Sequence, residues 1–196
     1  MNRYIYSGTF AVNNNETSLV DILIASDELE LLEVYQQLEK RLLENESAWE
    51  LPKDFITLYQ HHDRFANLYE VARELICKTP KVIFESKGFL LMEEDNLIQL
   101  LKCDDLRLEE IEIWEYLIKW GIENTDSILD DNLTKWTPMD FMELERTLHN
   151  FIPYIRFSQM SPKVYNLVRS QFKSIIPADL DDDVVQYFQI LIPNLY

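Results

Sequence analysis

The amino-acid sequence predicts a mainly α-helical protein. Only 3 of its 196 residues are Gly and 7 are Pro, which is too few turn formers for a β-sandwich. Apolar residues also recur at helical spacing, as in the series Leu31, Val34, Tyr35, Leu38 and Leu42. Hydrophobic residues make up 47% of the chain, enough for the core of one domain or two small ones. We therefore expect about ten helices and almost no sheet.

Two helices are predicted near the start of the chain. Thr17 or Ser18 can cap the first, because a side-chain hydroxyl accepts a hydrogen bond from an amide of the first turn. The second follows Asp27 and carries the apolar series given above, with charged residues opposite it. Residues 47–52 then interrupt the pattern, and Pro52 disfavours helix at the residue before it. We expect a domain junction in this segment.

Several short helices are predicted after the junction. Phe55, Leu58 and Tyr59 form one apolar stripe, and another runs through residues 68–76. Thr79 followed by Pro80 predicts a helix start, with Thr79 as the N-cap.

The most regular apolar stripe follows in the middle of the chain. It consists of Ile111, Trp114, Leu117, Ile118 and Gly121. Here Gly121 is either a helix end or a point of close contact.

The last third of the chain predicts a loop and then more helices. Residues 123–137 lose helical periodicity and favour a long acidic loop, in which Trp136 is a candidate for partner contact. Helical spacing resumes over 141–151, and Ser161 before a proline starts a further helix. A short final helix is expected from Asp179.

The charge of the chain is strongly negative and unevenly placed. The formal net charge is −17, from 18 Lys+Arg and 35 Asp+Glu. Residues 1–50 carry 10 acids and 3 bases, and residues 93–131 carry 13 acids and 3 bases, which accounts for the whole excess. Nucleic-acid binding is excluded, since it needs a basic stripe. The acidic stretches predict solvated helix faces or, alternatively, a docking patch for a basic partner.

No group of residues predicts an enzyme, a cofactor site or a metal site. Glycines occur only at positions 8, 88 and 121, so no glycine-rich phosphate loop can form. His61 and His62 are neighbours, and neighbours on a helix point about 100° apart and cannot share one metal ion. The paired carboxylates Glu109 and Glu110 are expected on a solvated surface.

Compartment and membrane signals are few. Cys77 and Cys103 are too few for a disulfide framework, which favours a reducing compartment. No apolar run approaches the length of a bilayer span, and no signal peptide is recognisable. We expect a cytoplasmic or nuclear protein without a membrane partner.

Two parts of the sequence resemble known protein families. The motif YIYSGTF at 4–10, followed by SLVDILIASDELELLEVYQQLEKRLLEN at 18–45, is similar to the second half of a BTB/POZ domain. Residues 84–106, EIEIWEYLIKWG at 110–121 and LHNFIPYIRFSQMSPKVYNLV at 148–168 resemble a BACK domain, the helical module that commonly follows BTB. The resemblance implies a Kelch-like or TLDc-type BTB adaptor.

This resemblance implies a domain order. It places the C-terminal half of BTB/POZ, its helical part, at 1–46, an all-α BACK helical bundle at 51–172 and a C-terminal extension at 173–196. Because the dimerising half of BTB is not in this sequence, homodimerisation is doubtful.

The resemblance also implies a function and a surface. The chain would be a protein-interaction module, a substrate adaptor or adaptor fragment of a cullin-RING ubiquitin ligase, with a cullin as partner. An alternative is a non-catalytic helical scaffold or regulator that has lost ligase coupling. The implied partner-binding residues are Leu51, Phe55, Leu58 and Tyr59. The same stripe is equally expected of a helix packed in its own core.

Overall fold

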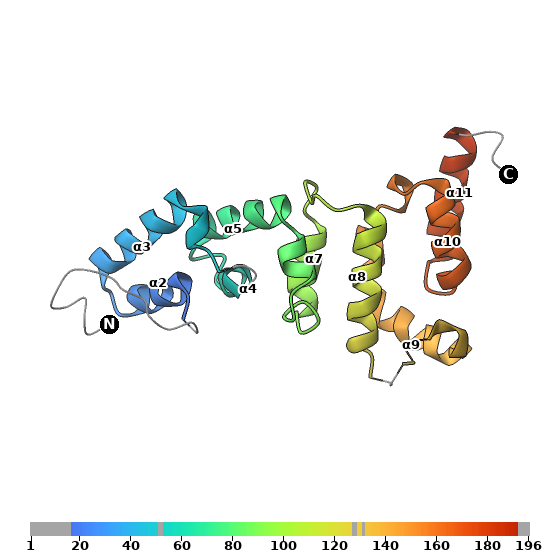
Figure 1. The fold of residues 1–196 in the computed structure, drawn as a ribbon, viewed down its shortest axis with the longest axis horizontal. Helices are drawn as coiled ribbons and strands as arrows, with labels where there is room; N and C mark the ends of the chain where they lie inside the picture. The colour runs from blue at the N-terminus through green and yellow to red at the C-terminus, as the bar shows by residue number, and fades with distance from the viewer. Residues whose placement is uncertain (1–16, 51–52, 127–128, 131, 192–196) are drawn as a thin grey trace. The chain divides into compact units, whose positions relative to one another are not determined.

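The computed structural model describes residues 17–50, 53–126, 129–130 and 132–191 (Figure 1). Within these ranges it contains helices and no strand, so the predicted mainly α-helical class is confirmed. The segment 4–10, which carries part of the BTB resemblance, lies outside the described residues, as does Leu51.

The described residues form ten α-helices and four 3-10 helices. The α-helices are α2 (Leu19–Glu28), α3 (Leu32–Glu44), α4 (Lys53–Tyr59), α5 (Ala66–Lys78), α6 (Lys81–Phe84), α7 (Glu94–Leu101), α8 (Glu110–Glu123), α9 (Pro138–Leu148), α10 (Pro162–Phe172) and α11 (Ala178–Leu191). The 3-10 helices are η1 (Glu46–Ala48), η2 (Leu133–Lys135), η3 (Ile152–Tyr154) and η4 (Phe157–Gln159).

The chain forms two compact units, residues 1–83 and 84–196. The boundary between these units follows Ile83, and the domain junction predicted at 47–52 stays a prediction. Within that segment the Trp49 ring is buried, and its Nε1 donates a hydrogen bond to the Leu42 carbonyl at 3.0 Å. This contact ties the end of α3 to the segment that follows it.

Helix α2 begins where the sequence predicts a cap. The Ser18 hydroxyl accepts a hydrogen bond from the Asp21 amide at 3.2 Å, and the Asp21 carboxylate accepts one from the Ser18 amide at 3.0 Å. This capping box satisfies two amide groups of the helix start. Of the two candidates, Ser18 is therefore the N-cap.

Helix α2 ends on a residue in the left-handed conformation, and this residue is Glu30 rather than a glycine. Its φ is 55°. The Leu31 amide donates to the Ser26 carbonyl at 2.8 Å, and the Glu30 amide donates to the Asp27 carbonyl at 3.0 Å. These two bonds are those of a Schellman motif. A residue with a Cβ atom costs about 1–2 kcal/mol in this conformation.

Replacing Glu30 by Gly is expected to raise the free energy of unfolding by about 0.5–1 kcal/mol, because Gly adopts a positive φ without steric cost. Urea unfolding followed by circular dichroism measures the change. Gln37→Gly, at an exposed position inside α3, is the control and should lower the free energy of unfolding by about 1 kcal/mol. An equal loss in both variants would contradict the left-handed conformation.

The core of the first unit comes from the apolar stripes. In α3, Val34, Leu38 and Leu42 are buried as the series predicts, whereas Tyr35 is half-buried and Leu31 is exposed before the helix. Helix α3 packs against α2 and α5, and α4 packs against α2 and α5 (Figure 1). The buried side chains of α5 are Leu68, Ala72, Leu75, Ile76 and Cys77.

The core of the second unit surrounds α8, which packs against α9 (Figure 1). The Trp114 ring contacts Phe157 and Phe172 edge-on, with centroids 5.4 and 5.6 Å apart. A Cβ atom on Gly121 would lie 2.7 Å from Leu144 Cδ1, which is closer than carbon atoms pack. Of the two predictions for Gly121, the close contact is therefore the one that the structure supports.

Three local predictions need correction. The Thr79 hydroxyl donates to the Leu75 carbonyl at 2.9 Å, so this side chain closes α5 and does not cap the next helix. The predicted loop at 123–137 contains η2 and the buried Leu129. Helix α11 has 14 residues and is not short.

Candidate functional site

The predicted partner-binding stripe lies mostly in the core. Phe55 is 1% exposed and Leu58 is fully buried, while Tyr59 is only half-buried. Phe55 stacks on Tyr69 of α5, with ring centroids 5.6 Å apart and planes 24° apart. In the free chain Phe55 and Leu58 are thus packed in the core, as expected of a helix that packs within its own domain. Tyr59 remains accessible to a partner.

Tyr59 belongs to a small aromatic cluster at the turn between α4 and α5. Its ring stacks on His62, with centroids 5.6 Å apart and planes 16° apart, and lies 6.0 Å from the Tyr69 ring. A hydrogen-bonding distance of 2.9 Å between His62 Nδ1 and the Tyr59 carbonyl fixes the turn. Partial burial raises the pKa of Tyr69. We call Tyr59, His62 and Tyr69 the aromatic cluster.

The sequence did not reveal this cluster. The sequence indicated only that His61 and His62 cannot share a metal ion, and both are exposed in the turn that follows α4. The contact between His62 and Tyr69 depends on how the turn folds back onto α5, which periodicity does not encode. Within the described ranges, no three His, Cys, Asp or Glu side chains are placed to hold a metal ion.

A charged group lies at the start of α4, beside the same stripe. Asp54 is fully buried, and its Oδ2 accepts a hydrogen bond from the Glu50 amide at 2.6 Å. The Ser18 side chain interacts with the same carboxylate through its hydroxyl, but Asp54 Oδ1 has no hydrogen bond of good geometry. Burial raises the pKa of Asp54, and these hydrogen bonds oppose the shift only in part.

Replacing Asp54 by Asn is expected either to leave the free energy of unfolding at pH 7 unchanged or to raise it by roughly 1 kcal/mol. This is the size of the penalty for one buried polar group that lacks a hydrogen bond. The pKa of Asp54 is raised in the folded protein, so the folded state binds its proton more tightly than the unfolded state does. Wild-type stability therefore falls as the pH rises through that pKa, and Asn removes this loss.

Urea unfolding of both proteins between pH 4 and 7 measures the effect of Asp54→Asn. The stability difference should grow in favour of Asn as the pH rises. Asp105→Asn, at an exposed position in the other compact unit, is the control and should show no such trend. A difference that is constant with pH would contradict the raised pKa of Asp54.

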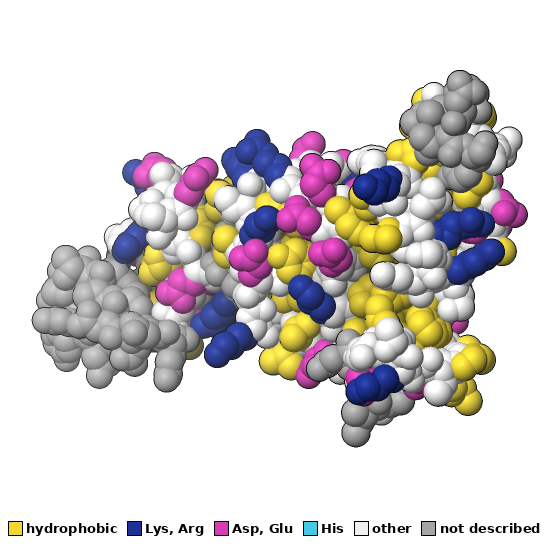
Figure 2. All heavy atoms as spheres, turned by 45° about the vertical axis from the view of Figure 1, so that its right-hand side comes forward, with side chains coloured by type: hydrophobic (Ala, Val, Ile, Leu, Met, Phe, Trp, Pro, Cys, Tyr) yellow, Lys and Arg dark blue, Asp and Glu magenta, His cyan; other side chains and the backbone are white. Residues whose placement is uncertain are grey.

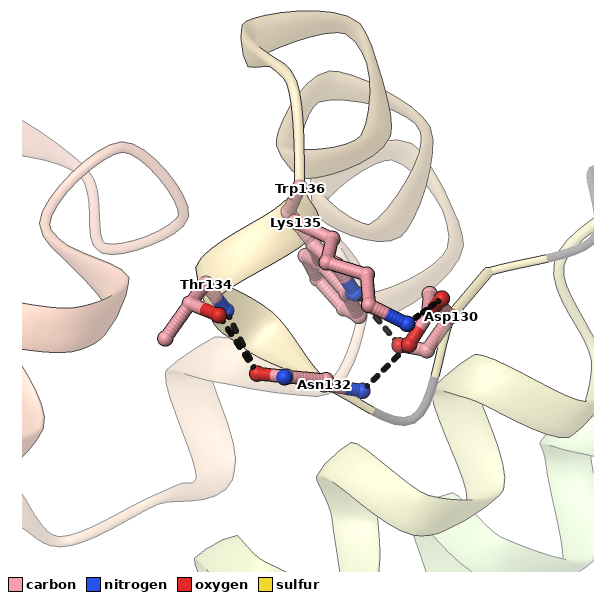
Figure 3. A network of polar contacts seen from close by, with 5 residues as sticks. All are labelled: Asp130, Asn132, Thr134, Lys135 and Trp136. Atoms are coloured by element: carbon pink, nitrogen blue, oxygen red, sulfur yellow. Dashed lines mark hydrogen bonds and ion pairs between the residues drawn. The ribbon is translucent and has the colours of Figure 1, made fainter.

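In the second unit, Trp136 is held in place by its own loop (Figure 3). Its Nε1 donates to the Asp130 carbonyl at 2.6 Å, and its ring meets Phe141 edge-on with centroids 5.0 Å apart. Lys135 pairs with the Asp130 carboxylate at 2.8 Å and lowers its pKa. The predicted candidate Trp136 is thus half-buried and fixed in orientation.

One predicted surface carboxylate is in fact buried. Glu110 is 7% exposed, and its carboxylate accepts hydrogen bonds from the Arg156 guanidinium and the Arg156 amide, both at 3.1 Å. Arg156 also contacts Asp104 at 2.9 Å. Glu110 therefore joins the start of α8 to the segment between η3 and η4, and the expectation of a solvated surface holds only for its neighbour Glu109.

An apolar groove lies between α8 and α10. It has a volume of about 270 Å³, and its lining includes Trp114, Val168 and Leu167, the last of which is 64% exposed. Pockets that hold drug-sized ligands measure about 300–1,000 Å³, so this groove is small for such a ligand.

Cys77 and Cys103 are both buried, and neither is a free thiol in the structure. They therefore give no support to the expected reducing compartment. Among the described residues, no helix is both long and apolar enough to cross a bilayer.

Comparison with protein-family models gives a match over more than half of the chain. The model of the family described as "BACK: BTB And C-terminal Kelch" matches residues 55–169. The matched segment begins inside α4 and ends inside α10, so it includes the Phe55 stripe, the aromatic cluster and Trp136. No curated protein matches the chain.

Proposed function

This chain belongs to the BACK family, and on that premise we propose that it acts as a substrate adaptor, or as part of one, in a cullin-RING ubiquitin ligase. The family is a non-catalytic, adaptor-type domain associated with protein–protein interaction. The single observation that carries the proposal is the family match over residues 55–169. An adaptor of this kind would act in the cytoplasm or the nucleus.

We place the cullin contact at the start of the matched segment, on its first helices and on Leu51 just before it. The proposed surface comprises Leu51 and the accessible part of the aromatic cluster around Tyr59. Phe55 would support this surface from within, because it is buried and stacks on the Tyr69 ring, and Leu58 is buried in the same helix. Half-exposed aromatic side chains favour such a role, since they bury much area at little entropic cost and are enriched among binding hot spots.

The test is to recover a cullin with the tagged full chain from cells. We expect Tyr59→Ala to weaken this association about tenfold or more, as for one hot-spot residue. Tyr187→Ala, which removes a 45% exposed Tyr from α11, is the matched control and should leave it unchanged. Thermal unfolding of both variants shows whether either change disturbs the fold.

Two outcomes would count against the proposal. If the wild-type chain recovers no cullin, the alternative of a helical scaffold or regulator without ligase coupling is favoured. If it recovers a cullin that Tyr59→Ala and Tyr187→Ala retain equally, the contact lies elsewhere.

A further inference from the structure

We propose that the outer face of α9, together with Trp136, binds a basic amphipathic helix of a partner protein. We call Trp136, Met139 and Met142 the α9 surface. The inference goes beyond the proposed function, because this surface lies in the other compact unit from Tyr59 and assigns a second kind of partner.

The apolar part of this surface consists of two methionines. Met139 is 61% exposed and Met142 is 57% exposed, although both belong to a helix whose other side is buried through Leu144 and Leu148. Residues three apart lie on one face of a helix, so the two thioethers are neighbours. Figure 2 shows hydrophobic side chains protruding at the lower right, over α9. Flexible methionines adapt to differently shaped apolar partners.

Trp136 adds a rigid anchor beside the methionines. The hydrogen bond to the Asp130 carbonyl (Figure 3) and the edge-on contact with Phe141 hold its ring in one orientation. A side chain that is fixed before binding loses little entropy when a partner covers it. The Asn132 carboxamide strengthens the loop by accepting hydrogen bonds from the Thr134 amide at 3.0 Å and hydroxyl at 2.8 Å.

The charge around the α9 surface selects a basic partner. Residues 123–148 contain seven acids and two bases. Both bases already pair with acids of the same stretch, since Lys135 contacts Asp130 at 2.8 Å and Arg146 contacts Glu143 at 3.2 Å. The remaining negative field attracts cations and repels acidic segments. An apolar stripe flanked by acids therefore fits a helix with an apolar face and Lys or Arg along its edges.

The binding test uses the full chain and a defined probe. The probe is an 18-residue amphipathic helical peptide of Leu and Lys, and its counterpart carries Glu in place of every Lys. Fluorescence anisotropy should show that the Lys peptide binds at least about tenfold more tightly than the Glu peptide, and that this binding weakens as salt screens the charges. Equal affinity for the two peptides would overturn the proposal.

Variants locate the binding site. The double change Met139→Ser with Met142→Ser should weaken binding of the Lys peptide about tenfold or more. Leu91→Ser, which removes an 80% exposed apolar side chain from the same unit, is the control and should change nothing. Arg146→Gln should instead tighten binding two- to threefold, roughly the effect of removing one exposed charge.

Hydrogen exchange gives an independent readout. Bound Lys peptide should slow the exchange of amides within residues 136–146. Protection confined to other residues, or an equal loss of affinity in Leu91→Ser and the Met double variant, would overturn the proposal. Tyr59 is unchanged in all these proteins, so peptide binding and cullin recovery are independent measurements. A failure of the cullin proposal can therefore be told apart from a failure of this one.

Discussion

Replacing Phe55 by Ala is expected to lower the free energy of unfolding by about 3–4 kcal/mol, as for other large aromatic side chains removed from a core. Phe55 is 1% exposed and stacks on Tyr69 of α5. Helix α4, which carries it, packs against both α2 and α5. Alanine would therefore leave a cavity where three helices of the first unit meet.

The comparison with Tyr59→Ala makes this result informative. Tyr59 is half-buried and contacts His62 and Tyr69 at the surface, so its removal should cost only about 1 kcal/mol. Urea unfolding at constant pH measures both variants. Equal, small losses would show that Phe55 is not a core residue and would return it to the candidate partner surface. The expected result makes Phe55 variants unsuitable as binding probes, because they perturb the fold.

Replacing Asp181 by Ala is expected to lower the free energy of unfolding by about 2–3 kcal/mol, slightly less than a fully buried ion pair because Arg169 is 32% exposed. Asp181 is 4% exposed in the first turn of α11. Its carboxylate accepts hydrogen bonds from Arg169 Nε at 2.6 and 2.9 Å and from the buried Tyr165 hydroxyl at 2.8 Å. Alanine would remove the link between α10 and α11 that these bonds form.

The effect of Asp181→Ala should depend on pH. The bond from Arg169, followed by the bond from Tyr165, lowers the pKa of Asp181 below its ordinary 3.8. A carboxyl group with a lowered pKa stabilises the fold fully above the unfolded-state pKa, and this stabilisation is lost as the pH falls through the folded-state pKa. The difference between wild type and variant should thus be constant above about pH 5 and narrow below about pH 4.

Asp182→Ala is the control for Asp181→Ala. Asp182 is the exposed neighbour in the same helix, and its loss should change the free energy of unfolding by at most about 0.5 kcal/mol. Urea unfolding at pH 7, 5 and 3 measures all three proteins. A loss in Asp181→Ala that stays the same at pH 3 would mean that the ion pair is not its cause.

Much of the helical organisation was predictable because its causes are local. Ser18 caps α2, and Ser161 caps α10 by accepting a hydrogen bond from the Val164 amide at 3.3 Å. In both cases donor and acceptor are three residues apart, so the sequence contains the whole interaction. Apolar spacing likewise predicted most of the buried positions of α3 and part of those of α8, where Ile111 is only half-buried and the buried Ile113 and Trp120 lie outside the predicted stripe.

The errors came from contacts between distant residues. Glu110 was expected in solvent, yet its partner Arg156 is 46 positions away. Thr79 was expected to cap the following helix, but its hydroxyl instead closes the preceding one. A short polar side chain can bond to either neighbouring backbone segment, and tertiary packing decides between them.

The sequence by itself determined the helical class, the capped starts of α2 and α10 and the apolar face of the most regular helices, because these follow from spacing and from hydrogen bonds within one turn. Only the tertiary structure decided what covers each apolar face. It buried Phe55 and Leu58, left Tyr59 accessible and left Met139 and Met142 uncovered on α9. Helical periodicity shows which face of a helix is apolar. That face is buried only where a second surface covers it, and helices remote in sequence supply that surface.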